Sequence, residues 1–131
     1  MISIDNVKVI LHLLSSNQED AMEAAKAIIA DPQRVPVEIL VQIARMKTLR
    51  TWSRICAVYA LGFTNSAEVG IALVEIVLDE TNAYSLRSFA AEALGNLRAK
   101  NSTPVLQDLY SKTTNADLKK SCAYALSQMR A

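Results

Sequence analysis

Side chains that could carry catalytic or metal chemistry are few in this chain. His12 is the only histidine among 131 residues. A protein site for a transition metal needs several imidazole, thiolate or carboxylate ligands at suitable spacing, and no cluster of Asp or Glu accompanies His12. We therefore interpret His12 as a solvated surface residue. The sequence predicts no metal site and no cofactor.

The two cysteines, Cys56 and Cys122, stand inside apolar helical stretches. A catalytic thiol needs a base or a positive charge beside it. Arg54 is near Cys56 in the sequence, but there is no histidine in the same segment. We expect both cysteines to be free, buried packing residues in a reducing compartment. With no candidate nucleophile or base, we expect that the protein is not an enzyme and has no catalytic residue.

Trp52, the only tryptophan, lies between Arg50 and Arg54. One interpretation is an aromatic anchor flanked by positive charge, suited to a base, a carboxylate or a partner peptide. The other is that Trp52, Cys56 and Tyr59 lie on one face of a helix and pack it against its neighbour. We favour packing.

Basic residues gather only locally, at Arg45, Lys47, Arg50 and Arg54, and the formal net charge is +1. Nucleic-acid binding needs several phosphate contacts along a groove, and no stripe of Lys or Arg recurs along this chain. We therefore expect no nucleic-acid partner.

The first apolar run, MISIDNVKVILHLL, is interrupted by Asp5, Lys8 and His12 and has no basic segment before it. It fits neither a signal peptide nor a membrane span. We therefore expect no membrane partner and, with free cysteines, a cytoplasmic location.

The elements that position these residues follow from a repeated phrase. AVYALGFTNS is followed by AAEALGNLRA and CAYALSQMRA, and Leu61 lies 33 residues before Leu94. The intervening segments keep the same register in the columns Val7, Leu40, Leu73, Leu106; Ile10, Ile43, Ile76, Leu109; and Leu11, Ala44, Val77, Tyr110. Self-similarity at such a period is typical of stacked helical repeats.

Each repeat contains two helical patterns, one with apolar residues at i, i+3 and i+4 and one with small residues three apart. Small side chains let a neighbouring helix approach closely. We predict an all-α fold, an α-solenoid of four stacked helical hairpins forming a single domain over residues 1–131. The eight helices are expected at 4–15, 18–30, 36–47, 51–63, 67–79, 84–98, 102–112 and 116–130.

Arg87 followed by AAEALGNL, after VLDE, resembles HEAT repeats of the short type found in phycobilin lyase-like proteins. The resemblance covers nearly the whole chain. It implies that Asp79 pairs with Arg87 and that the second helix of each hairpin lines the concave side. It also implies an alternative function, that of a chromophore (bilin) lyase or tetrapyrrole-binding protein. The single histidine argues against HEAT-type hydroxylases, which bind iron through several His–Glu pairs.

The main functional prediction is a non-catalytic protein-binding scaffold, such as an adaptor, an inhibitor or a chaperone-like factor. Ile71 and Leu78 are apolar at positions that should be exposed, and polar residues surround them. We predict that a protein partner binds on the concave face through Gln42, Arg45, Ile71, Glu75, Leu78 and Asp108. Burial of Ile71 and Leu78, self-association and a purely structural stack are the alternatives.

Overall fold

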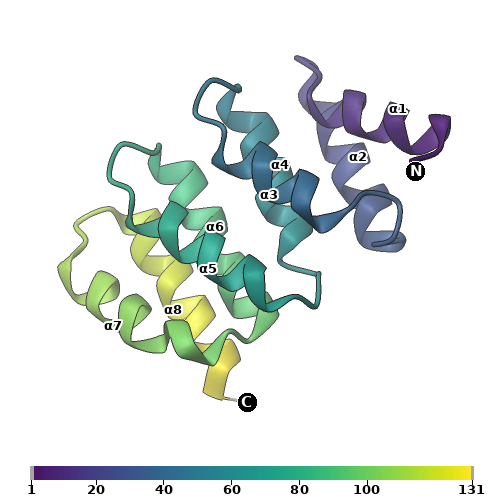
Figure 1. The fold of residues 1–131 in the computed structure, drawn as a ribbon. Coiled ribbons are helices and arrows are strands. Elements are labelled where there is room, and N and C mark those ends of the chain that lie inside the picture. The colour runs from purple at the N-terminus through teal and green to yellow at the C-terminus, as the bar shows by residue number, and fades with distance from the viewer. Residues whose placement is uncertain (1, 131) are drawn as a thin grey trace.

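The computed structural model describes residues 2–130, and within them the chain forms eight α-helices, a short 3₁₀ helix and no strand (Figure 1). This confirms the predicted all-α solenoid. The helices are α1 (Ile4–Leu13), α2 (Gln18–Ala30), α3 (Val37–Arg45), α4 (Thr51–Leu61), α5 (Ala67–Leu78), α6 (Tyr84–Leu97), η1 (Lys100–Ser102), α7 (Thr103–Lys112) and α8 (Ala116–Arg130).

The hairpins stack so that the helices form two layers. Figure 1 shows α3, α5 and α7 side by side in front of α4, α6 and α8. Neighbouring second helices, above all α6 and α8, contact each other extensively, whereas contacts between neighbouring first helices are sparse. The layer of second helices is therefore the closely packed, inner layer of the stack. The first helices form the more widely spaced, outer layer.

Glycine and alanine make the close packing of the inner layer possible. A Cβ atom on Gly62 would lie 3.1 Å from the Cα of Ala93 in the next repeat, and one on Gly95 would lie 2.6 Å from the Cα of Ala125. Such separations are well inside ordinary carbon–carbon contact. The repeated phrase in the sequence is thus a packing requirement, because each copy must fit the backbone of the next.

The leucine column predicted for the core is buried in the three later repeats. Leu40, Leu73 and Leu106 are fully buried. These leucines belong to one continuous core, which extends from the first hairpin to the last. The core therefore fixes the register of the stack from α3 to α7.

The first helix departs from the predicted register. Val7 and Leu11 stand in core columns, yet they are 42% and 60% exposed. α1 instead buries Val9 and Leu13, because it packs mainly on α2 and touches α4 rather than continuing the outer layer. The prediction that Val7 and Leu11 join the core was therefore wrong.

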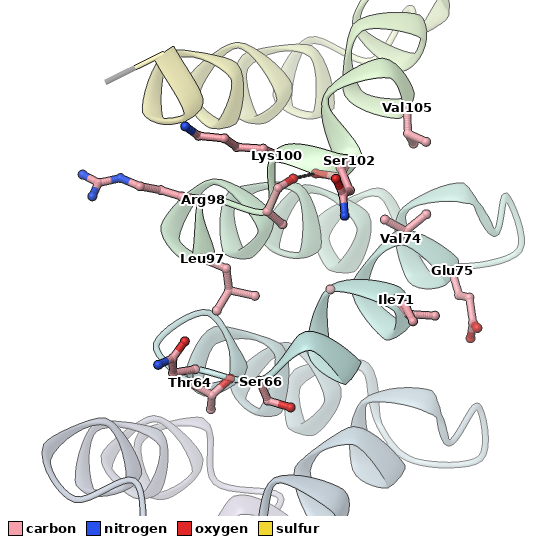
Figure 2. A pocket seen from close by; sticks show the side chains of 14 residues that line it. Thr64, Ser66, Ile71, Val74, Glu75, Leu97, Arg98, Lys100, Ser102 and Val105 are labelled. Atoms are coloured by element: carbon pink, nitrogen blue, oxygen red, sulfur yellow. Dashed lines mark hydrogen bonds between the residues drawn. The ribbon is translucent and has the colours of Figure 1, made fainter.

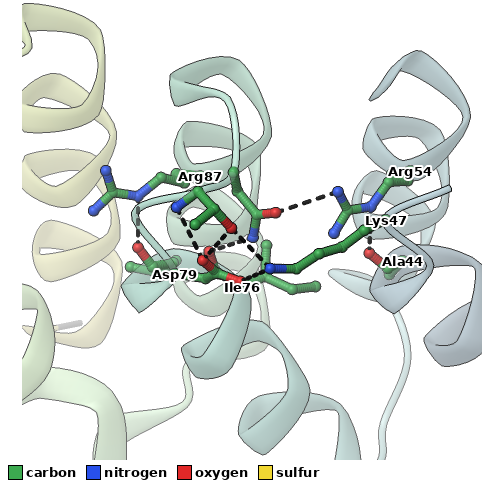
Figure 3. A network of polar contacts seen from close by, with 9 residues as sticks. Ala44, Lys47, Arg54, Ile76, Asp79 and Arg87 are labelled. Carbon is green, nitrogen blue, oxygen red and sulfur yellow. Dashed lines mark hydrogen bonds and ion pairs between the residues drawn. The ribbon is translucent and has the colours of Figure 1, made fainter. Parts of the chain in front are cut away.

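Two arginines, each in the second helix of its hairpin, bind the first helix of the same hairpin with the same geometry. The Nε of Arg54 donates to the carbonyl oxygen of Ala44 at 2.9 Å, and the Nε of Arg87 donates to that of Val77 at 2.8 Å. Both side chains are buried, and each acceptor lies ten residues before its arginine (Figure 3). Each arginine thus satisfies a carbonyl at the end of the first helix of its own hairpin, where intrahelical donors run out.

The expected pairing of Asp79 with Arg87 was wrong. The carboxylate of Asp79 instead binds Lys47 of the preceding repeat at 2.6 Å and accepts a hydrogen bond from the hydroxyl of Thr81 (Figure 3). The hydrogen bonds from Lys47 and Thr81 hold the pKa of Asp79 well below its usual range. Because the guanidinium of Arg87 is used by a carbonyl, the aspartate is free to link two repeats.

Candidate functional site

All six residues predicted to bind a partner are exposed, and they lie on first helices: Gln42 and Arg45 on α3, Ile71, Glu75 and Leu78 on α5, and Asp108 on α7. Those helices form the outer layer. The expected concave location is therefore corrected to the outer face of the stack. That these residues bind a partner stays a prediction.

The polar members of this set are partly occupied by contacts within the chain. Arg45 and Glu75 form an ion pair at 3.0 Å between α3 and α5, and Asp108 pairs with Lys112 at 3.0 Å on α7. The apolar members are largely uncovered by the rest of the chain, since Ile71 is 64% exposed and Leu78 is 51% exposed. The alternative that the helices curl enough to bury these two side chains was wrong.

Beside Ile71 lies a groove that the sequence did not predict. It has a volume of about 770 Å³ and runs between α5 and the segment that leads into α7 (Figure 2). Its apolar lining comes from Gly70, Ile71 and Val74 on α5, Leu97 at the end of α6, Ala99 after α6, and Val105 on α7.

Two local features open the groove. One is the connection after α6, where the left-handed residue Arg98 and then Ala99 lead into η1. The hydroxyl of Ser102 donates to the carbonyl of Ala99 at 2.6 Å and holds this turn. The other feature is Gly70, which lies opposite this turn. A Cβ atom added at Gly70 would make only an ordinary contact, at 3.9 Å, with the Cβ of Ala99. Gly70, the one glycine outside the repeated phrase, was the signal that could have indicated an opening here.

Positive charge lies at one end of the groove. Arg98 and Lys100 are exposed lining residues, and neither forms an ion pair with any residue in the described part of the chain. In Figure 2 their side chains extend outward from the groove, on the side opposite Glu75 and Val105. Two unpaired cationic side chains thus flank one end of the apolar groove.

The other chemistry-bearing candidates lie away from this groove. His12 is exposed on α1. Cys56 and Cys122 are free and buried, as predicted. Burial raises the pKa of each thiol to about 11, which disfavours the nucleophilic thiolate. The packing interpretation of Trp52 is confirmed, because its ring is half-buried against the core and its Nε1 donates to the carbonyl of Gln18 at 3.1 Å.

The local cluster of basic residues is engaged inside the molecule. Arg45 binds Glu75, Lys47 binds Asp79, and Arg50 donates to the carbonyl of Leu14 at 2.7 Å. Burial lowers the pKa of the fourth member, the Arg54 guanidinium, and Asp79 partly offsets the effect. These four side chains therefore do not form a free cationic surface.

Residues 2–130 contain no group of three or more His, Cys, Asp or Glu side chains arranged to hold a metal ion. None of the helices in this described part is long and apolar enough to cross a membrane.

The fold is similar to that of a known enzyme. Human deoxyhypusine hydroxylase, solved in complex with glycerol, superposes with a TM-score of 0.73 at 17% sequence identity. The similarity covers 96% of this chain and 43% of the hydroxylase chain, so this chain spans less than half of that chain's length. No protein-family model matches the chain, and no curated protein matches it in sequence. The stacked hairpins and this similarity show a HEAT-like helical repeat fold; the closer resemblance to phycobilin lyase-type repeats stays a prediction.

This similarity contradicts the expectation that the protein is not an enzyme. That expectation rested on the lack of a candidate nucleophile or base, and the single histidine also argued against HEAT-type hydroxylases. A hydroxylase nevertheless has this fold over nearly the whole of the chain. At 17% identity the similarity establishes the fold alone, and fold does not determine function.

Proposed function

We propose that this protein is a scaffold that binds another protein on its outer face, beside the groove between α5 and α7. The observation that carries the proposal is the exposure of Ile71, 64% accessible at the wall of a largely apolar groove of about 770 Å³. A contiguous apolar surface with a polar rim is typical of a protein-binding site.

The positions of Ile71 and Leu78 are polar or proline in the neighbouring repeats. Thirty-three residues before and after Ile71 stand Glu38 and Pro104, and the corresponding neighbours of Leu78 are Arg45 and Ser111. A solenoid that needed only to stack would have no reason to place large apolar side chains at two such positions of one repeat. The pattern therefore favours a binding surface over a purely structural stack.

The size of the apolar surface limits the binding free energy that a partner can gain here. Burying a branched aliphatic side chain completely contributes about 1.5–3 kcal/mol, and Ile71 and Leu78 each have part of that still to gain. Association itself costs about 4–15 kcal/mol in lost freedom. These two side chains alone cannot sustain tight binding, so the groove lining must contribute as well.

The proposal is tested by affinity purification from the source cell, comparing wild type with the variant Ile71→Lys/Leu78→Lys. The matched control is Ile4→Lys/Leu11→Lys on α1, where two aliphatic side chains are also 77% and 60% exposed. Circular dichroism melts establish that both variants fold. We expect a protein captured by wild type and by the control to be lost from the α5 variant.

Two results would contradict the proposal. Capture of the same proteins by all three forms would show that the α5 surface binds none of them. Loss from the α1 variant alone would place the binding surface on α1 instead.

A further inference from the structure

We infer that the groove between α5 and α7 accepts an acidic protein segment that carries at least one large apolar side chain. The inference rests on the proposed function and specifies the chemistry of the partner. The apolar side chain would lie against Ile71, Val74 and Val105, and carboxylates of the segment would bind Arg98 and Lys100. Three features of the groove support this inference: its apolar lining, its charge and the backbone of Arg98.

The apolar part of the lining is preformed. Val74, Leu97 and Val105 are half-buried, so each still presents part of its surface to the groove. Ile71 is the most exposed of the apolar lining residues at 64%. A leucine, isoleucine or phenylalanine side chain of a partner would remove this surface from water without a rearrangement of the helices.

The charge of the lining is unbalanced. Among the lining residues of the described chain, Arg98 and Lys100 are cationic and Glu75 is the only carboxylate. Glu75 is already paired with Arg45 at 3.0 Å. The free charge at the groove is therefore positive, and it complements carboxylates. Arginine binds a carboxylate through two parallel hydrogen bonds, which adds geometric selectivity.

The backbone of Arg98 points independently to a role for its side chain. Arg98 is the only residue with a positive φ within 2–130, at φ 52° and ψ 47°. This left-handed position at a helix end is usually occupied by glycine, because a side chain there costs about 1 kcal/mol or more. Residues held in such conformations gather at ligand-binding sites. The turn caps α6, because the N–H groups of Arg98 and Ala99 donate to the carbonyls of Gly95 and Leu94. Glycine would make the same hydrogen bonds without the cost, so the cap does not account for the exposed arginine side chain.

The experiment is selection of a displayed library of random ten-residue peptides on immobilised protein, with sequencing of the enriched peptides. The variants are Arg98→Glu/Lys100→Glu and Ile71→Lys. The control, Lys8→Glu/Lys120→Glu, makes the same change in net charge at two exposed lysines on α1 and α8. Affinities of the best peptides are measured by fluorescence anisotropy at low and high salt.

We expect wild type and the control to enrich peptides that combine Asp or Glu with a large apolar residue. The affinity of these peptides should fall at least tenfold in the Arg98→Glu/Lys100→Glu variant, which should select basic residues instead. It should also fall at 0.5 M salt, because exposed ion pairs are screened. The Ile71→Lys variant should lose the enrichment.

Failure of this inference is distinguishable from failure of the proposed function. If enrichment requires Ile71 but the peptides show no acidic excess, or charge reversal changes neither composition nor affinity, the acidic partner is refuted and a groove for apolar segments remains. If no enrichment depends on Ile71, both the inference and the groove as a binding site are refuted.

Discussion

Replacing Gly95 with alanine should destabilise the protein, although the same change in an exposed helix ordinarily stabilises it. Gly95 lies inside α6, in the layer where α6 and α8 pack most extensively. An added Cβ would lie 2.6 Å from the Cα of Ala125 and 3.0 Å from its Cβ. The first of these atoms belongs to the backbone of α8, so no side-chain rotation relieves the contact.

The size of the effect follows from two opposing terms. Alanine gains about 1 kcal/mol over glycine in helix propensity. Carbon atoms are normally about 3.5–4.0 Å apart, so the 2.6 Å separation requires α8 to move by about 1 Å. Overpacking of this kind costs about 1–3 kcal/mol and sometimes more. Because the clash is with backbone, we expect the upper part of that range, and a net loss of about 1–2 kcal/mol.

Urea denaturation followed by circular dichroism measures this free energy, and Gly70→Ala is the matched control. Gly70 also lies in a helix, but its added Cβ would meet only Ala99 at 3.9 Å. That variant should gain about 0.5–1 kcal/mol. Adding Ala125→Gly should fail to rescue Gly95→Ala, since the Cα remains in place. A Gly95→Ala protein as stable as Gly70→Ala would refute the close approach of α6 and α8.

Three further predictions concern single side chains. Arg98→Gly should raise the unfolding free energy by about 1 kcal/mol, measured in urea, because glycine accepts the left-handed backbone without strain; it should also weaken acidic peptides. Asp79→Asn should be less stable than wild type at pH 7, and the difference in unfolding free energy should shrink below about pH 4. The lowered pKa of Asp79 stabilises the folded state only where the carboxyl group is ionised in the unfolded chain. Leu94→Ala, at a fully buried position, should cost about 2–5 kcal/mol by the same urea measurement, and an unchanged midpoint would contradict the register of the stack.

Repetition made the fold predictable from a single sequence. Each repeat restates the same packing requirement, so agreement between copies compensates for the weak signal of any one helix. The phrase around Leu61 and Leu94 indicated both the hairpins and their close approach, which Gly62 and Gly95 show atom by atom. Helix ends were predicted less well, because the last turns near Met46 and Phe63 depend on local hydrogen bonds rather than on the period.

Features that belong to one repeat only were not predictable in this way. The partner of Asp79 is Lys47, 32 residues earlier, whereas the resemblance to short HEAT repeats implied the nearer Arg87. The departure of α1 from the predicted register, which leaves Val7 exposed, occurs at the end of the stack, where the repeat pattern no longer describes the neighbours. Exposure of Ile71 was predicted, but the adjoining groove was not, because it depends on the turn that follows α6.

The two layers divide stability and binding between them. Glycine and alanine bring the inner helices so close that nothing larger than a hydrogen fits at Gly95, which leaves that contact no room for a ligand. Since each first helix is joined to a second helix by a short connection, close packing of the inner layer is accompanied by wider spacing of the outer one. This wider spacing leaves room between neighbouring first helices, and the turn after α6 shapes that room into the groove between α5 and α7. Outer positions that face the groove, such as Ile71, contribute little to the core and are free to differ between repeats.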